Sequence, residues 1–266
     1  MRILKNVSLK LYSTMRLGGT ADFLTTAKSK EDLEEAEAWA EARELPLRVI
    51  GSGSNIVWRD EGFKGLLVVN KIRGFKKISE DHLSETYRIG AGEDWDTIVE
   101  QAAGLGLYGI EALSLVPGTA GATPVQNVGA YGQDISQTLV SLEAYDRMEK
   151  AFVVITNADC GFGYRTSRFK GIDNGRFLIS SIDLKLQKMP ATAPSNSVQT
   201  YLEEHDISKR DPMTIRRAVI AIRKAKLPDP TKVANNGSFS NTRDRVRDGH
   251  AGEVILIKGN LVDSRE

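Results

Sequence analysis

The stretch LVPGTAGATPVQNVGAYG, residues 115–132, contains the strongest fold signal in the chain. It carries no charged residue, whereas solvated loops are usually charged or serine-rich, so we expect it to lie against a ligand. The alternative is a buried loop of a glycine-rich fold. Its glycines permit left-handed backbone angles and a close approach of main chain to a bound molecule; they are Gly118, Gly121, Gly129 and Gly132. Successive N–H groups in such turns form anion sites without lysine, and the Gln126–Asn127 amides suit a planar heterocycle.

A second glycine motif, VIGSGSN, occupies residues 49–55. The apolar run from Leu47 to Ile50 predicts a strand that leads into it, and its serines and asparagine add hydrogen-bonding groups. The motif lacks the third glycine and the following helix of a Rossmann fingerprint, since a second apolar run, Leu66–Val69, follows instead. Together the two motifs predict one extended ligand that is held from two sides.

The composition is that of a water-soluble globular protein, with 41% hydrophobic and 27% charged residues among 266. A net charge of +1 favours neither nucleic acid nor a membrane surface as partner. The single cysteine, Cys160, excludes an intrachain disulfide and fits a reducing compartment. We find no signal peptide and no membrane-spanning stretch, so we expect a cytoplasmic protein.

Three histidines, His82, His205 and His250, are too far apart for metal-ligand spacing, and we interpret them as surface residues without a metal.

Hydrophobic periodicity predicts an α+β chain in three units. Residues 1–70 form a small α/β unit whose helix begins with the capping-box pair Ser29 and Asp32. Residues 71–190 form a second unit with a helix capped by Asp94 or Asp96 and stopped by the glycines of residues 104–106. Strands are expected in the second unit at residues 87–90, 139–145, 152–155 and 177–186.

A third unit, residues 195–266, follows the linker-like segment 190–197. Here we predict an amphipathic helix with Thr214 as its cap and Pro228 as its stop, and a strand over Glu253–Lys258. The helix carries five basic residues, which are either a solvated face or a phosphate site; they are Arg216, Arg217, Arg223, Lys224 and Lys226.

Two further segments carry side chains suited to chemistry. In the segment 162–170, Arg165 can bind a carboxylate through its forked guanidinium group. In the segment 235–239, Ser238 lies on a small turn, where a hydroxyl could donate a proton to a carbanion-like intermediate; alternatively it is only a turn serine. No histidine is near it and no Gly-x-Ser-x-Gly elbow is present, so hydrolase chemistry has little support.

Taken together, these motifs resemble the UDP-N-acetylenolpyruvoylglucosamine reductase (MurB) family of flavoenzymes in bacterial peptidoglycan synthesis. The matching segments run in order from about residue 10 to residue 240. They are residues 14–19 (TMRLGG), 49–55 (VIGSGSN), 90–95 (GAGEDW), 117–132, 162–165 (FGYR), 226–230 (KLPDP) and 236–239 (NGSF).

The resemblance implies a two-subdomain FAD-binding module of the vanillyl-alcohol-oxidase/PCMH type, residues 1–70 and 71–190, and a truncated substrate-binding domain, residues 195–266. It implies FAD and NADPH as cofactors and a UDP-sugar enolpyruvyl ether as substrate, in a protein that we expect to be a monomer. The residues it assigns to FAD are Gly51, Ser52, Gly53, Ser54, Asn55, Pro117, Gly118, Gly121, Ala122, Thr123, Gly129, Ala130 and Ile179.

The resemblance also assigns the reaction to two side chains. Arg165 would stabilise the negative charge that develops on the substrate carboxylate, and Ser238 would protonate the α-carbon of the enol ether. The residues that it implies hold the substrate are Tyr131, Tyr164, Tyr201, Lys226 and Asn241.

The end of the chain departs from this family pattern. The family's chain continues well past the Gly-Ser-Phe turn to a strand with a catalytic glutamate, but this chain ends soon after Ser238, and we assign that role to neither Glu253 nor Glu266. Three alternatives therefore stay open: an active reductase, an FAD-binding relative with impaired catalysis, and an alcohol or sugar oxidase of the same superfamily.

Overall fold

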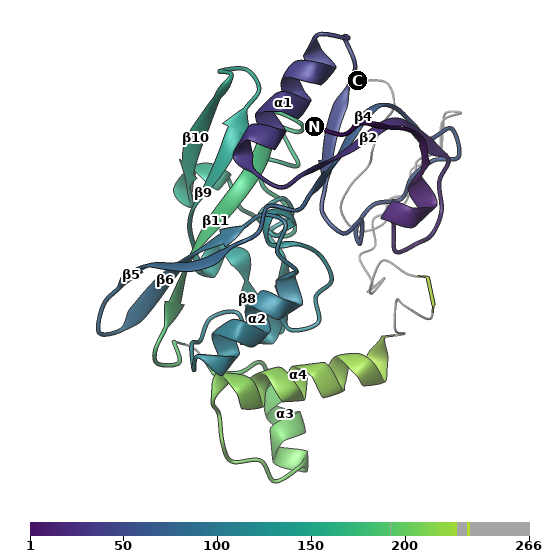
Figure 1. Ribbon diagram of the computed structural model, residues 1–266. Helices are drawn as coiled ribbons and strands as arrows, with labels where there is room; N and C mark the ends of the chain where they lie inside the picture. Colours follow the sequence, from purple (N-terminus) through teal and green to yellow (C-terminus); the bar gives the residue numbers. More distant parts are fainter. Residues whose placement is uncertain (192, 228–232, 235–266) are drawn as a thin grey trace.

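Two β-sheets and a pair of helices form the part of the chain described by this computed structural model, residues 1–191, 193–227 and 233–234 (Figure 1). The first sheet has the order β1-β2-β4-β3, in which β1 is antiparallel to β2 and the others are parallel. Its strands are β1 (Leu4–Ser8), β2 (Thr20–Ala27), β4 (Phe63–Asn70) and β3 (Leu47–Ile50). The strands predicted on either side of the 51–55 loop are confirmed.

The second sheet is antiparallel throughout and has the order β10-β9-β11-β6-β5. Its strands are β5 (Phe75–Glu80), β6 (Ser84–Gly90), β9 (Leu139–Asp146), β10 (Ala151–Thr156) and β11 (Phe177–Gln187). The strands predicted in this unit are confirmed. A two-residue ladder joins β7 (Gly129–Ala130) to β8 (Gln133–Asp134) within the glycine-rich region.

Helix α1 (Lys30–Glu41) packs between the two sheets. The predicted capping box is present, with Ser29 as the N-cap residue and reciprocal hydrogen bonds to Asp32. The buried face of α1 consists of Leu33, Ala36 and Ala40. It contacts residues of both sheets, namely Leu47, Leu66 and Val68 of the first and Tyr145 and Leu178 of the second.

Helix α2 (Trp95–Gly104) buries Ile98, Val99 and Ala102 in the core of the second sheet. Asp94 is its N-cap residue and accepts a hydrogen bond from the Thr97 N–H at 3.0 Å, and the helix ends at the predicted glycines. Short 3₁₀ turns complete the connections: η1 (Leu9–Tyr12), η2 (Glu111–Leu113), η3 (Ala120–Ala122), η4 (Ile135–Gln137) and η5 (Ala158–Cys160).

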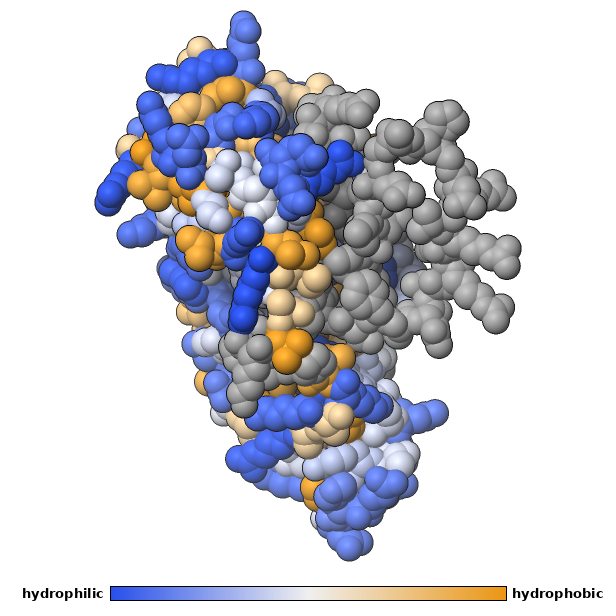
Figure 2. All heavy atoms as spheres, turned by 90° about the vertical axis from the view of Figure 1, so that its right-hand side faces the viewer, coloured by the Kyte–Doolittle hydropathy of each residue, from blue (hydrophilic) through white to orange (hydrophobic). Residues whose placement is uncertain are grey.

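Helices α3 (Asn196–Glu204) and α4 (Pro212–Lys226) lie at the lower end of the molecule in Figure 1, where α4 packs against α2 and α3 packs against α4. The two helices pack against each other through the buried side chains of Val198, Leu202, Ile215 and Val219. Their outer surface in Figure 2 is largely hydrophilic. The sequence analysis did not predict α3, although Val198 and Leu202 have helical spacing.

The prediction that Thr214 caps α4 is wrong. Asp211 is the N-cap residue, and its carboxylate accepts hydrogen bonds from the N–H and the hydroxyl of Thr214, both at 3.0 Å. Pro212 occupies the first helical position, where its fixed φ angle favours the helix and its missing N–H costs nothing. The predicted strand over residues 253–258 and the predicted stop at Pro228 lie outside the described residues.

The buried side chain of Asn70, 4% exposed at the end of β4, links the two sheets. Its Nδ2 donates to the Ile179 carbonyl of β11 at 2.9 Å, and its Oδ1 accepts from the Ile72 N–H at 3.1 Å. Buried main-chain groups need such partners, because an unsatisfied one retains the full cost of its desolvation.

We expect Asn70→Ala to lower the free energy of unfolding by about 1–3 kcal/mol, because it leaves a buried carbonyl and an N–H unpaired. Urea unfolding measures the change. The matched control is Asn174→Ala, at an exposed position, which should change stability by less than about 0.5 kcal/mol. Equal stabilities of the two variants would show that Asn70 does not hold the sheets together.

Cys160 is fully buried, and this burial raises the pKa of its thiol to about 12. Since the thiolate is the reactive species, iodoacetamide at pH 8 should modify the folded protein at least about 100-fold more slowly than free cysteine. The measurement is mass spectrometry over time, with the urea-unfolded chain as the fast control. Rapid modification of the folded chain would contradict the buried position.

Candidate functional site

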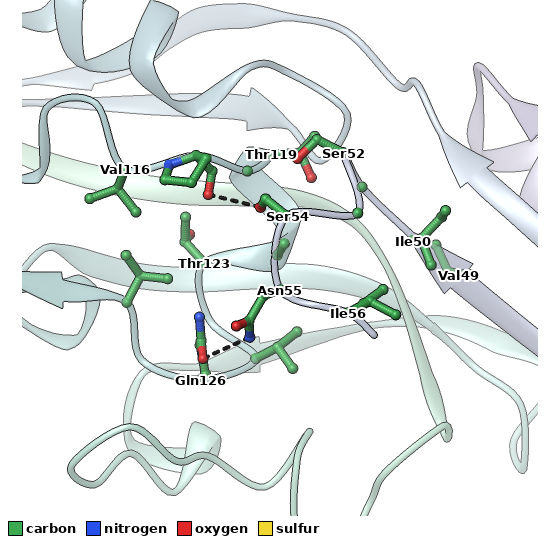
Figure 3. A pocket seen from close by; sticks show the side chains of 17 residues that line it. Val49, Ile50, Ser52, Ser54, Asn55, Ile56, Val116, Thr119, Thr123 and Gln126 are labelled. Atoms are coloured by element: carbon green, nitrogen blue, oxygen red, sulfur yellow. Dashed lines mark hydrogen bonds between the residues drawn. The ribbon is translucent and has the colours of Figure 1, made fainter. Parts of the chain in front are cut away.

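The two glycine motifs meet at one cavity, between the loop that follows β3 and the long segment 116–128 (Figure 3). Both loops belong to the chain's least charged segments, and no charged side chain is among the described residues that line the cavity. The lining residues are Val49 to Ile56, Val116 to Thr119, Ala122, Thr123, Val125, Gln126 and Val128.

Two hydrogen bonds join the facing loops. The Ser54 hydroxyl donates to the Pro117 carbonyl at 3.1 Å, and Asn55 Nδ2 donates to Gln126 Oε1 at 2.9 Å (Figure 3). The polar side chains of the VIGSGSN motif thus fix the position of the second loop, and they do this over more than sixty residues of sequence.

Glycine is required at two positions of the first loop. A Cβ atom at Gly51 would lie 2.2 Å from Thr119 Oγ1, so the two loops could not approach as they do. Gly53 has a φ of +70°, and a Cβ atom there would lie 2.0 Å from the Tyr12 carbonyl oxygen. Substitution at either position therefore requires movement of the chain.

Main-chain donors of this loop are free to bind an anion. Within the part of the chain that the structure describes, the N–H groups of residues 52–55 donate no hydrogen bond. A run of such N–H groups in a tight turn is an anion-binding arrangement.

A second cavity of about 310 Å³ adjoins the first and shares six of its lining residues. The shared residues are Ser54, Asn55, Val116, Pro117, Gln126 and Val128. The second cavity is also lined by Gly129, Ala130, Tyr131, Arg165, Arg223, Lys226 and Leu227. Three cationic side chains from two distant parts of the sequence therefore line this cavity, whereas the first cavity has none.

Arg165 is held by carbonyl groups of the glycine-rich segment. Its Nη1 donates to the Asn127 carbonyl at 3.4 Å, and its Nη2 donates to the Gly129 carbonyl. Asn127 in turn donates from Nδ2 to the Gly163 carbonyl at 3.1 Å, which fixes the turn that carries Arg165. No carboxylate among the described residues pairs with Arg165, Arg223 or Lys226, so their charge is available to an anionic ligand.

Arg223 is a site residue that sequence reasoning did not single out from its basic cluster. Its Nη2 donates to the Leu115 carbonyl at 3.2 Å, and its Nε is buried without a partner among the described residues. Burial lowers the pKa of Arg223, against the opposing effects of Tyr131 and Asp96. Its spacing of three residues from Lys226 places both on one helix face, which is the signal that could have identified it.

The other residues predicted to bind FAD or substrate lie partly within the two cavities and partly away from them. Tyr131 lines the second cavity, whereas Tyr164 is 78% exposed and Tyr201 stacks on His205 with ring centroids 4.0 Å apart. Neither Tyr164 nor Tyr201 is among the described lining residues. Gly121 packs against Ala91, where a Cβ atom would lie 2.4 Å away.

Ile179 is buried in β11, with its carbonyl bound to Asn70. Ser238 and Asn241 lie outside the described residues.

Among the described residues, no three histidine, cysteine or acidic side chains gather as metal ligands would, and no helix has the length and apolarity to span a bilayer. His82 and His205 are exposed, as predicted, and His250 lies outside the described residues.

The chain is similar in sequence and in structure to known flavoproteins. Residues 21–153 match the FAD binding domain family. The chain is 38% identical over 240 residues to a Pseudomonas syringae protein named UDP-N-acetylenolpyruvoylglucosamine reductase, covering 90% of this chain and 70% of the relative. The chain belongs to this reductase family. The protein of the same name from Ralstonia nicotianae is 38% identical over 233 residues, covering 86% of this chain and 68% of that protein.

Solved structures agree with the membership in the reductase family. The reductase (MurB) of Thermus caldophilus is similar with a TM-score of 0.64 and 26% identity, over 86% of this chain and 71% of that one. A cholesterol oxidase from B. sterolicum shares the fold alone, with a TM-score of 0.53 and 14% identity, over 70% of this chain and 37% of the oxidase. The predicted fold class, an α+β FAD-binding module of the vanillyl-alcohol-oxidase/PCMH type, is confirmed.

The residues of the first cavity fit the FAD of this family. The pyrophosphate of a dinucleotide needs N–H donors and space beside the main chain, and residues 52–55 offer the donors while Gly51 and Gly53 offer the space. Gly118 adds a φ of +142° with only Ser54 Oγ nearby, at 3.6 Å from a Cβ atom built on it. The cavity thus accommodates an anion without a lysine.

We expect Gly51→Ala to lower the amount of FAD that copurifies with the protein by at least about tenfold, because the clash with Thr119 forces the loops apart. Absorbance at 450 nm per protein chain gives the FAD content. Adding Thr119→Ala removes the two nearest atoms and leaves its Cβ at 3.1 Å, so the double variant should regain part of the FAD.

The matched control is Gly104→Ala in α2, where no atom lies within 4 Å of the added Cβ. It should retain normal FAD content. Equal FAD loss in the Gly51 and Gly104 variants would contradict the assignment of the first cavity.

Proposed function

We propose that this chain is an NADPH-dependent flavin reductase that converts the enolpyruvyl ether of UDP-N-acetylglucosamine to UDP-N-acetylmuramate in peptidoglycan synthesis. The observation that carries the proposal is the pairing of an uncharged, donor-rich cavity with an adjoining cavity lined by Arg165, Arg223 and Lys226. The reductase names of the family relatives, 38% identical, support the substrate assignment.

In this proposal residues 1–70 and 71–190 are the two FAD-binding subdomains, and residues 195–266 belong to the substrate-binding domain. FAD, when bound, supplies hydride chemistry. The residues that would hold FAD are those predicted from the sequence, with the 51–55 loop at the pyrophosphate. Ile179 and Gly121 would act by packing, since both are held against neighbouring main chain.

The second cavity suits the substrate because the enolpyruvyl ether of a UDP-sugar carries a carboxylate and a diphosphate. Arg165 would bind the carboxylate and stabilise its increasing negative charge; its two carbonyl partners fix the guanidinium before the substrate arrives. Arg223 and Lys226 would bind the diphosphate, and Tyr131 lines the same cavity. Ser238 would deliver its hydroxyl proton to the α-carbon. Tyr164, Tyr201 and Asn241 remain proposed substrate contacts.

The deciding experiment is anaerobic stopped-flow spectroscopy of the purified, FAD-loaded chain. NADPH should bleach the flavin absorbance, and the enolpyruvyl sugar nucleotide should restore it with formation of UDP-N-acetylmuramate. Bleaching without recovery would instead identify an impaired relative. Rapid bleaching by an alcohol or sugar in the absence of NADPH would identify an oxidase of the same fold.

We expect Arg165→Met to lower kcat by about 10²–10³-fold while FAD content is unchanged, because it removes a fixed cation from the developing charge. Steady-state kinetics measure this loss, and Arg165→Lys should recover only part of it, since lysine lacks the fork. The control is Arg43→Met, at an exposed position in the turn after α1, with unchanged kcat. A normal kcat in Arg165→Met would remove Arg165 from the mechanism.

A further inference from the structure

An ion pair between a buried arginine and a half-buried aspartate joins α4 to α2. Arg216, only 5% exposed, donates from Nη1 and Nη2 to Asp96 Oδ1 and Oδ2 at 2.5 and 3.0 Å. Asp96 stands in the first turn of α2, 120 residues before Arg216 in the sequence, so the pair joins two distant segments of the chain. A forked arginine–carboxylate pair fixes orientation as well as distance.

The same carboxylate also holds the loop of the FAD cavity. Asp96 Oδ1 accepts from the Leu115 N–H at 2.6 Å, and Leu115 has a left-handed φ of +54°. The Leu115 carbonyl accepts from Arg223 of α4 at 3.2 Å. The two main-chain polar groups of one residue are therefore bound by Asp96 on one side and by α4 on the other, immediately before the cavity-lining residues 116–118.

Helical geometry connects this arrangement to the cations of the second cavity. Arg216 and Arg223 are seven residues apart, which places them on one face of α4, and Lys226 follows three residues later on the same face. The bond between Arg216 and Asp96 therefore joins to α2 the same helix that carries Arg223 and Lys226 into the second cavity.

We propose that Asp96 and Arg216 are positioning residues that set the affinity of the second cavity for a diphosphate, by fixing α4 against the loop at Leu115. The inference rests on the proposed function for the natural substrate, but the anion-binding role itself does not depend on turnover. A pair of this kind contributes little net stability compared with an apolar replacement, so its structural value is the defined position it imposes.

The alternative to positioning is a purely structural pair, whose loss would affect folding and FAD together. The pair of substitutions Asp96→Asn and Arg216→Met in one chain separates the two roles. It removes both charges together, which avoids an unpaired buried ion, and asparagine can still accept from the Leu115 N–H. Only the link that Arg216 makes between α4 and α2 is then lost, and the bond of Arg223 to the Leu115 carbonyl remains.

The experiment measures three quantities on FAD-loaded protein: FAD content, the Kd for inorganic pyrophosphate by calorimetry, and kcat and KM for the substrate. In the Asp96→Asn/Arg216→Met chain we expect normal FAD content, a Kd for pyrophosphate and a KM that both rise about tenfold, and a kcat within about threefold of the parent. Arg216→Lys, which keeps the charge without the fork, should give intermediate values.

The matched control is Arg217→Met, which removes one charge from an exposed position of the same helix and should leave the Kd and KM within about twofold of the parent. A double variant that matches this control, a double variant that loses its FAD, or a parent chain that does not bind pyrophosphate would each overturn the inference. The parent chain could also lack turnover while its pyrophosphate binding weakens as expected in the double variant. That result would support the positioning role and contradict the proposed reductase function.

Discussion

The close approach of the 51–55 loop to the 116–128 segment is the constraint on which the site depends. Gly51 lies so near Thr119 that a methyl group would not fit between them, and the hydrogen bonds of Ser54 and Asn55 hold the loops at that distance. The first loop follows β3 of the first sheet, and the second lies between β6 and β9 of the second sheet. Their approach therefore requires the two sheets to be fixed relative to each other. Helix α1, which buries its apolar face against both, and Asn70, which binds β11, provide this fixation.

The distribution of charge divides the site into two parts with different physical character. The first cavity offers main-chain N–H groups and neutral side chains, which are suited to binding a pyrophosphate through directed hydrogen bonds. The adjoining cavity presents three cations with no acidic partner among the described residues, and in a partly buried setting such charges attract an anion strongly. Because no charged side chain lines the first cavity, these cations are available to a second, anionic ligand.

The cations reach the cavity by two different structural routes. Arg165 stands on a turn that is fixed by the carbonyl groups and the side chain of the glycine-rich segment itself. Arg223 and Lys226 come from α4, which is joined to α2 by the Arg216–Asp96 ion pair and to the Leu115 carbonyl by Arg223. The geometry of the second cavity is therefore a property of the contact between α4 and the FAD-binding units, since neither part alone brings the three cations together.

The sequence alone identified the two glycine motifs, most strands, the capped helices α1 and α2, and Arg165 and Lys226 as site candidates. These features depend on local chemistry: glycine at left-handed positions, caps three residues from their partners, and apolar runs. The sequence analysis placed the α4 N-terminus wrongly because both Asp211 and Thr214 can cap a helix. Asp211 is the stronger candidate, since the proline that follows it favours the first helical position. Residue type alone gave no reason to choose Arg223 as a site residue over the four other cations of the same helix.

Tertiary structure decided which of those five cations acts where. Arg216 is buried on Asp96, Arg217 is exposed, and Arg223 lines the cavity, although all lie on one basic helix. The reason is physical: periodicity shows which side of a helix is apolar, but the partner of a charge depends on the surface that the helix packs against. That surface is assembled from residues more than one hundred positions away, such as Asp96 and Leu115.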